Sequence, residues 1–387
     1  MNAPIYLDHS ATTPVHPEVL EAMLPFFGPR FGNPSSVHRW GREARTAVAD
    51  ARERIARCLG AQPDEVSFVS CGTEGDNLAI LGTWRAARGT PRAAVVTTPI
   101  EHKAILGAVH QAAREGAVER ILTVDANGVV ESDSFDALVL PDVAVCSVMW
   151  VNNETGTMQS VPELGARARD RGVVFHTDAV QAFGKVKIDA TTQAFDLLTI
   201  SGHKIGAPKG IGAVYVRRGT QVEPILHGGS QERGRRSGTE NVAYCVGLAR
   251  AAEIADAERD VEVARLERLR DELEAVFLRE IPGAVIHARS GPRAPHIVNV
   301  SFPDTDSDSM LMALDLAGIA ASAGSACQSG STTPSHVLSA IGVRPDLAAC
   351  AVRFSLGSLT TDDAIDRAGR MIPALVAKAR GLTGVPA

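Results

Sequence analysis

Short apolar segments alternate with longer amphipathic segments between about residues 60 and 216 of the chain. The apolar segments are almost continuous in valine, isoleucine, leucine and alanine, which is typical of strands that are buried on both faces. Such strands, alternating with helices, form a largely parallel sheet that is covered on each side. The pattern therefore predicts an α/β fold with strands at 66–69, 93–98, 118–124, 143–149, 173–176, 196–200 and 212–216, and helices at 72–87, 102–114 and 162–171.

The pattern changes after residue 241. Residues 241–280 interleave acidic and basic side chains and predict one long, solvated helix that bridges to a second domain. Because 387 residues exceed what a single core usually covers, we expect a large domain over 15–255 and a smaller α+β domain formed by 1–14 and 256–387. The shorter elements predicted after Pro282 are strands at 284–287, 297–301 and 352–356, helices at 308–316 and 361–379, and a loop rich in glycine and serine at 323–331.

The composition is ordinary for a globular protein: 45% of the residues are hydrophobic, 22% are charged, and the net charge of −6 gives no basic footprint for nucleic acid. No apolar run approaches membrane-spanning length, and residues 1–4 resemble no part of a signal peptide. The six cysteines are scattered without a CxxC pair, which indicates reduced thiols. We therefore expect a cytoplasmic protein that binds no membrane and has no strong direct affinity for nucleic acid.

Two predicted strands are followed by groups that suit pyridoxal phosphate chemistry. Lys204 comes shortly after the strand at 196–200, and Asp178 comes shortly after the strand at 173–176. A lysine amine can form an imine with the cofactor, and an aspartate can hold its pyridinium nitrogen. Ligands of parallel sheets bind at the carboxyl ends of the strands, so the two side chains predict a cofactor site at that edge.

Two helix starts add candidate groups to the same edge. Gly72 and Thr73 open a helix after the strand at 66–69, so their N–H groups and the threonine hydroxyl suit a phosphate, although a plain N-cap is the alternative. His102 follows the strand at 93–98. Its imidazole suits stacking on a cofactor ring and proton transfer, and the alternative is again a simple cap.

Two further side chains suit recognition of a carboxylate. Asn153 belongs to a turn after the strand at 143–149, where asparagine either makes local turn hydrogen bonds or donates to a cofactor oxygen or substrate carboxylate. Arg353 lies on the strand at 352–356, and its guanidinium fork matches the carboxylate of an amino acid. A structural salt bridge is an equally good interpretation of Arg353.

Two polar loops complete the candidate chemistry. Residues 231–239 carry three arginines and end in Ser237-Gly238-Thr239, which suits either a solvated loop or contact with a phosphate from a neighbouring subunit. Cys327 lies among small residues, where a thiol is expected to be exposed and able to travel. Thiolates are strong nucleophiles that carry sulfur, so Cys327 predicts sulfur transfer, with an incidental thiol as the alternative.

Together these segments resemble the aminotransferase class V family and, more narrowly, its group I cysteine desulfurases (NifS/IscS-like). The resemblance runs nearly end to end and implies PLP-dependent fold type I, with a mainly parallel, mixed seven-stranded sheet in a large domain and a smaller α+β domain. The motifs that carry it are 6–14, 32–38, GTEGDN at 72–77, EHK at 101–103, VNNETG at 151–156, HTDAVQ at 176–181, SGHKIGAPKGIGA at 201–213, QERGRRSGTEN at 231–241, GSACQSG at 324–330, 334–338 and 352–357.

The resemblance also implies roles for individual residues. Lys204, Cys327 and His102 would be catalytic: Lys204 binds the cofactor and moves the Cα proton, Cys327 attacks the substrate sulfur, and His102 stacks on the ring and shuttles protons. Asn153 and Arg353 would take the substrate carboxylate. No resident metal is expected, although Cys327 would be free to contact a nascent iron–sulfur cluster. The implied cofactor ligands are Gly72, Thr73, Asn153, Asp178 at the pyridine nitrogen, Gln181 at the phenolic oxygen, Ser201, His203, Lys204 and Thr239 of the partner subunit.

The implied reaction converts L-cysteine to L-alanine and leaves a persulfide on Cys327, which a sulfur-acceptor protein then takes. The implied partners are that acceptor and a second copy of the chain, in a homodimer with shared active sites. The acceptor would serve iron–sulfur cluster assembly, tRNA thiolation or DNA phosphorothioation, and the overall resemblance leans toward the last, the DndA-like branch.

Two rival interpretations remain from the sequence. One is another class V enzyme: an aminotransferase, or a lyase acting on selenocysteine or cysteine sulfinate. Transamination needs no thiol, so Cys327 argues against an aminotransferase. The other rival is a scaffold with a degenerate site, against which the presence of Lys204, Asp178 and His102 argues.

Overall fold

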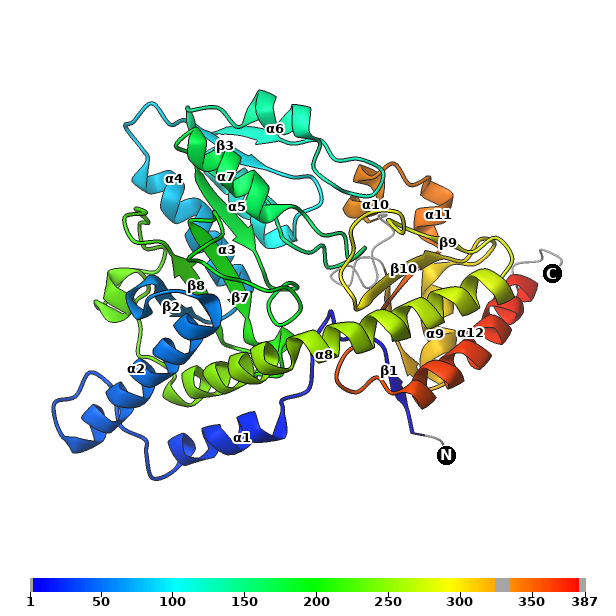
Figure 1. Ribbon diagram of the computed structural model, residues 1–387, viewed down its shortest axis with the longest axis horizontal. Helices are drawn as coiled ribbons and strands as arrows, with labels where there is room; N and C mark the ends of the chain where they lie inside the picture. Colours follow the sequence, from blue (N-terminus) through cyan, green and yellow to red (C-terminus); the bar gives the residue numbers. More distant parts are fainter. Residues whose placement is uncertain (1–2, 324–334, 383–387) are drawn as a thin grey trace.

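The computed structural model describes residues 3–323 and 335–382. The larger part of the molecule, on the left in Figure 1, is built on a twisted seven-stranded sheet. Its strands lie in the order β2-β8-β7-β6-β5-β3-β4. Strand β8 runs antiparallel to both of its neighbours, and the remaining pairs are parallel. The predicted mixed, mainly parallel sheet is therefore confirmed. Its strands are β2 (Val66–Val69), β3 (Ala94–Thr97), β4 (Val118–Ile121), β5 (Val143–Ser147), β6 (Val174–Asp178), β7 (Leu197–Ser201) and β8 (Gly212–Val216).

The helices that follow the strands cover the sheet as predicted, with one irregularity. The helical segment after β2 begins as α3 (Gly72–Asn77), widens into a π-helical turn η3 (Leu78–Gly82) and continues as α4 (Thr83–Ala86). Helices α5 (Lys103–Arg114) and α7 (Val161–Asp170) match the predicted ranges within one residue. Because β2, β3 and β5 run in the same direction, the helices that follow them begin at the same edge of the sheet.

Helix α2 (Arg39–Leu59) was absent from the prediction, although its sequence is amphipathic. Ala44, Ala47, Val48, Ala51 and Ile55 recur at helical spacing and are buried, which explains why this face packs inward. Gly60 ends the helix with φ 63°, a left-handed conformation that glycine adopts without strain.

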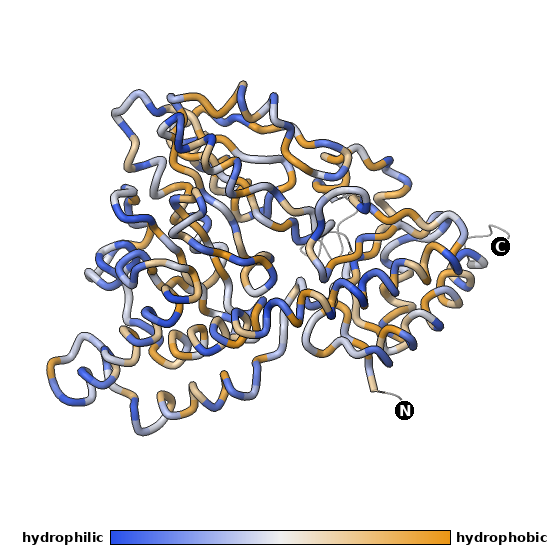
Figure 2. The backbone as a smooth tube through the Cα atoms, in the orientation of Figure 1, coloured by the Kyte–Doolittle hydropathy of each residue, from blue (hydrophilic) through white to orange (hydrophobic). Residues whose placement is uncertain are grey.

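The long helix α8 (Val242–Glu280) runs between the two parts of the molecule (Figure 1). Its first turns, up to Ala252, belong to the hydrophobic core around the large sheet, and Leu266–Phe277 belong to a second core. Figure 2 shows hydrophobic and hydrophilic residues alternating along α8, whereas the strands are predominantly hydrophobic. The helix thus contributes to both cores, while the predicted domain boundaries themselves stay a prediction.

The second core forms on a smaller antiparallel sheet in the order β12-β13-β10-β9. Strand β1 (Ile5–Tyr6) pairs with β11 (Ile319–Ala320), so the start of the chain joins this C-terminal part. The other elements here are β9 (Val285–Ile286), β10 (Ile297–Ser301), β12 (Ser322–Ala323), β13 (Ala351–Ser355), α9 (Ser307–Leu316), α10 (His336–Ala340), α11 (Pro345–Ala349) and α12 (Asp362–Leu382). Helices α1 (Pro17–Met23) and α6 (Ser132–Leu138) contribute buried side chains to the core of the large sheet. No helix within the described ranges is both long and apolar enough to cross a membrane.

Candidate active site

A cavity of about 420 Å³ lies where several strands of the large sheet end. It brings together almost all of the residues singled out from the sequence, from segments as far apart as 72 and 353. Cys327 lies outside the described residues, and Thr239 is exposed and does not line the cavity of its own chain. The predicted residues that line the cavity are Gly72, Thr73, His102, Asn153, Asp178, Gln181, Ser201, His203, Lys204 and Arg353.

Lys204 ends a short 3₁₀ turn that follows β7 directly. Its Nζ donates hydrogen bonds to the carbonyl oxygens of Ser10 (2.5 Å) and Ala11 (2.7 Å). Burial lowers the pKa of Lys204 to about 8, and the charge of Arg353 adds to this, against the opposing effect of Asp178. A larger fraction of the amine is therefore neutral near physiological pH, which is the form that acts as nucleophile or base.

Asp178 is the last residue of β6 and is 5% exposed. Its Oδ1 accepts a hydrogen bond from the backbone N–H of Val180 at 2.8 Å. Burial raises the pKa of Asp178, while His102 and Lys204 act in the opposite direction. A cation bound against this carboxylate would relieve the cost of burying it.

Gln181 lies three residues after Asp178, and both the nitrogen and the oxygen of its side-chain amide have partners. Nε2 donates to the carbonyl oxygen of Ser10 at 2.9 Å, and Oε1 lies 3.3 Å from Nε2 of the buried His296. The side chain is therefore fixed at the wall of the cavity.

The start of α3 presents groups that suit an anion. The N-cap is Cys71, whose side chain makes no capping hydrogen bond, so Thr73 is not the plain cap that was the alternative interpretation. A Cβ at Gly72 would come within 3.0 Å of Val180, which leaves little room for any other residue there. The hydroxyl of Ser201 is buried and has no hydrogen-bond partner in the described part of the chain. Open helix N–H groups beside an unpaired hydroxyl form a cup for phosphate.

His203 completes this end of the cavity as a neutral group. Burial lowers its pKa to about 4, with Lys204 and Lys209 adding to the effect. Its Nδ1 lies 3.2 Å from the hydroxyl of Thr12.

His102 is both a helix cap and a cavity residue. It is the N-cap of α5, and its Nδ1 accepts a hydrogen bond from the backbone of Ala104 at 3.2 Å. The ring nevertheless lines the cavity with Asp178 and Lys204. The two interpretations of this histidine are thus compatible, because the cap holds the ring where it faces the cavity.

The two neighbouring asparagines have different surroundings. Asn152 is fully buried, and its side chain makes local turn hydrogen bonds, accepting from the backbone of Glu154 and Thr155 at 2.9 Å. Asn153 lines the cavity instead. The turn interpretation therefore holds for Asn152, and Asn153 is the one placed for ligand contact.

Arg353 forms a structural salt bridge and also lines the cavity, where it is available to a carboxylate ligand. Its Nη2 pairs with Asp8 at 2.9 Å, and its Nη1 donates to the carbonyl oxygen of Asn153 at 2.9 Å. The side chain is 1% exposed, and its Nε has no partner among residues 3–323 and 335–382. A buried guanidinium whose Nε–H has no partner, on the wall of a cavity, suits a carboxylate ligand.

The sequence did not single out several other residues that line this cavity. Ser10 and Ala11 were inside a motif but had no assigned role, and their carbonyl groups hold Lys204. Asp76 was likewise inside a motif, GTEGDN at 72–77, but had no assigned role, because its position within a predicted helix does not show that it is buried. The unpredicted lining residues are Ser10, Ala11, Cys71, Asp76, Met149, Val151 and Val180.

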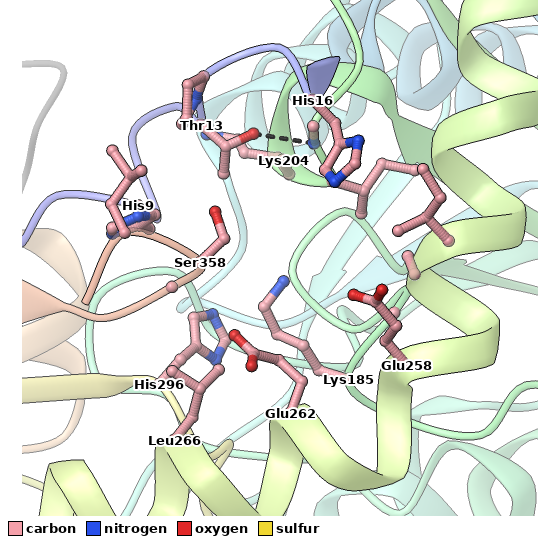
Figure 3. Close-up of a pocket in the computed structure, with 18 of the residues that line it drawn as sticks. His9, Thr13, His16, Lys185, Lys204, Glu258, Glu262, Leu266, His296 and Ser358 are labelled. Carbon is pink, nitrogen blue, oxygen red and sulfur yellow. Dashed lines mark hydrogen bonds between the residues drawn. The ribbon is translucent and has the colours of Figure 1, made fainter. Parts of the chain in front are cut away.

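A second, larger cavity of about 600 Å³ lies on another side of Lys204 (Figure 3). Its walls come from residues 13–17, from α8 and from residues 356–359. Lys185 points into it beside Glu262 and His296, and Thr13 accepts a hydrogen bond from the backbone of Gly206 at 2.9 Å. Among the predicted site residues that the structure describes, Lys204 alone lines both cavities.

The chain is similar to known proteins over most of its length. The aminotransferase class V family model matches residues 5–368. The chain is 45% identical to the cysteine desulfurase NifS of Azotobacter vinelandii over 382 residues, covering 98% of this chain and 94% of that protein. It is similar to the structure of a NifS-like protein (TM-score 0.91, 35% identity, 97% and 100% covered) and to that of DndA from Streptomyces lividans (TM-score 0.78, 38% identity, 90% and 99% covered).

Proposed function

Because the chain belongs to the aminotransferase class V family and, within it, to the cysteine desulfurases, we propose that it removes sulfur from L-cysteine at the 420 Å³ cavity, using pyridoxal 5′-phosphate. The products are L-alanine and a persulfide on Cys327, from which an acceptor protein takes the sulfur. One observation carries the proposal: a lysine amine of lowered pKa and a buried carboxyl group lie on neighbouring strand ends in one cavity.

The residues of the cavity fit this cofactor. The buried carboxyl of Asp178 suits a pyridinium nitrogen, and the fixed amide of Gln181 suits the phenolic oxygen. The helix start and the unpaired Ser201 hydroxyl suit the phosphate. In a homodimer, Thr239 of the partner subunit would reach the same phosphate. The groups proposed at the phosphate within one chain are Gly72, Thr73, Ser201 and His203.

When bound, pyridoxal phosphate supplies an electron sink for the negative charge that develops at Cα of the substrate. Arg353 and Asn153 hold the substrate carboxylate, which fixes the position of Cα. Lys204 removes the proton from Cα and returns a proton later, and its lowered pKa keeps the amine available for this step. His102 moves protons on the side of the cavity from which α5 begins.

Sulfur leaves the substrate by attack of the Cys327 thiolate on the substrate Sγ. A sulfur–sulfur bond forms and the Cβ–Sγ bond breaks, with its electron pair remaining on the carbon fragment, which is protonated to alanine. The persulfide then passes to a thiol of the acceptor protein by thiol exchange. The acceptor belongs to iron–sulfur cluster assembly, tRNA thiolation or DNA phosphorothioation.

Replacement of the thiol tests this assignment. We expect Cys327→Ser to take up the cofactor and show its absorbance but to form neither alanine nor sulfide. Cys58→Ser is the matched control, because burial raises the pKa of the Cys58 thiol to about 11 and makes it unreactive. Normal turnover by Cys327→Ser would exclude Cys327, and wild-type protein that takes up no pyridoxal phosphate would exclude the cofactor.

Labelling identifies the acceptor. Protein loaded with ³⁵S from labelled cysteine is mixed with the candidate acceptor proteins of the three pathways, and the label is followed after separation. Transfer to one acceptor, absent with Cys327→Ser, assigns the pathway. Label that remains on the wild-type enzyme with every candidate contradicts transfer to these acceptors.

A further inference from the structure

A second buried acid, Asp76, faces the cavity that contains Asp178. It lies on α3, is 1% exposed and lines the cavity with Asp178 and Lys204. Its Oδ1 has no hydrogen-bond partner within the described ranges of the chain. The proposed mechanism uses Asp178 and leaves Asp76 without a role.

The immediate neighbours of Asp76 are polar but uncharged. His176 Nε2 lies 3.8 Å from Asp76 Oδ1 and 3.0 Å from the hydroxyl of Thr199, and its Nδ1 lies 2.8 Å from the hydroxyl of Ser147. Burial lowers the pKa of His176 to about 3, so this imidazole is neutral and supplies no positive charge. No lysine or arginine of the described residues forms an ion pair with Asp76.

The acidic groups near Asp76 oppose its ionisation. Burial is the largest factor and raises the pKa of Asp76 well above its ordinary value. The nearby Asp178, Glu101 and Cys71 raise it further, and only a hydrogen bond from Thr199 acts the other way. Two buried carboxyl groups in one cavity cannot both ionise without a large cost, so the group with the better cationic partners keeps the charge. Lys204 and His102 act on Asp178, which makes Asp178 that group.

Close packing holds Asp76 in this place. A Cβ at the preceding Gly75 would come within 2.7 Å of Thr199 Cγ2, so α3 lies directly against β7. Thr199 is in turn the register partner of Asp178 on the neighbouring strand. The packing of Gly75 on Thr199 therefore holds this part of α3, including Asp76, near the strand position that pairs with Asp178.

We propose that Asp76 is a positioning residue that keeps its carboxyl group protonated, so that Asp178 alone carries negative charge toward the bound cofactor. This inference rests on the proposed function, since it concerns the same cofactor. The unpartnered Oδ1 is the oxygen available to donate or accept a hydrogen bond in the cavity.

Infrared spectroscopy of the cofactor-free protein tests the protonation state directly. A protonated acid has a carbonyl stretch separate from the carboxylate bands, and the stretch shifts in heavy water. We expect Asp76→Asn to lose one such band near neutral pH. Glu101→Gln is the matched control, because Glu101 is also buried, with a pKa raised to about 8 by burial, but does not line the cavity. It should lose a different band, and an unchanged acid region in folded Asp76→Asn overturns the proposal.

Cofactor binding tests the positioning role. The neutral amide of Asp76→Asn has the shape of a protonated carboxyl group, so we expect its cofactor Kd to stay within about threefold of wild type. Asp76→Ala lacks the polar group, and we expect it to bind the cofactor about tenfold more weakly. Asp178→Asn should weaken binding more than either, because it removes the charge. Equal losses in Asp76→Asn and Asp178→Asn would show that Asp76 is ionised. Wild-type protein without affinity for pyridoxal phosphate would refute the proposed function and leave the infrared result valid.

Discussion

The two cavities beside Lys204 differ in how their walls are built. The smaller one, of about 420 Å³, collects side chains from the ends of β6 and β7, from two helix starts and from β13. The larger one, of about 600 Å³, lies between the N-terminal segment, α8 and the turn after β13 (Figure 3). Its charged groups are already partly matched, since Arg265 pairs with Glu262 at 2.6 Å.

The comparison shows that the chemistry of the unsatisfied groups, and not volume, marks the site. In the larger cavity the buried atoms without partners in the described part of the chain are His9 Nε2 and His296 Nδ1, on imidazoles whose pKa burial lowers. Ser201 Oγ, Asp76 Oδ1 and Arg353 Nε are buried and lack partners in the part of the chain that the structure describes, and all three residues line the smaller cavity. Buried polar groups without partners are costly, so several of them in one cavity indicate a ligand. Substitutions on the two sides of Lys204 should therefore have very different effects.

The largest effect is expected from Lys204→Ala. Loss of the amine removes both cofactor attachment and the base, so alanine formation should fall at least about 10³-fold. Alanine release from L-cysteine is the measurement, with Lys209→Ala, an exposed lysine a few residues on, as control. More than a tenth of wild-type activity in Lys204→Ala would refute the role of this cavity.

A smaller but still large effect is expected from Arg353→Lys. Lysine keeps the positive charge but lacks the paired N–H donors of the guanidinium, so one charge-assisted hydrogen bond to the substrate carboxylate, worth ~1.5–3 kcal/mol, should be lost. This loss corresponds to about a 10- to 150-fold rise in KM for L-cysteine. Cofactor absorbance should persist. Arg344→Lys, at an arginine with a 73% exposed side chain, is the control. An unchanged KM in Arg353→Lys would show that Arg353 serves only its structural contacts, the salt bridge with Asp8 and the hydrogen bond to Asn153.

A modest effect on the pKa of Lys204 is expected from substitution of Lys185, which lines the larger cavity. The charge of Lys185 helps to lower the pKa of Lys204, although burial and Arg353 contribute more. The rate of cofactor uptake by cofactor-free protein should rise with pH and level off above about 8, because only the neutral amine reacts. Lys185→Met should move this midpoint upward and slow uptake at pH 7 by about twofold to threefold. A midpoint near that of an ordinary lysine in the wild type would contradict the lowered pKa.

The smallest effect is expected from Glu258→Gln, at an exposed residue that lines only the larger cavity. Such a substitution usually changes stability and activity little, so kcat/KM for L-cysteine should stay within about twofold. A loss comparable to that of Arg353→Lys would show that the larger cavity takes part in substrate handling and would remove the contrast between the two.

Most of the fold was predictable from the sequence because strand and helix periodicity are local properties. Each strand of the large sheet was placed within a few residues, and the strand-end positions of Asp178 and Lys204 followed from it. Helix α2 also has apolar residues at helical spacing, which are visible in the sequence, but it was not predicted. The π-helical turn Leu78–Gly82, whose residues are all buried, was not predicted.

The sequence by itself determined the elements, the order of the strand-end groups and the family, because these depend on residue spacing along the chain. Only the tertiary structure decided which interpretation of each polar residue holds. Asp8 and Arg353 are 345 positions apart, and Asp76 acquires its surroundings from β6 and β7. Burial and charge pairing at such distances arise when separate elements pack together, and they have no counterpart in local sequence pattern.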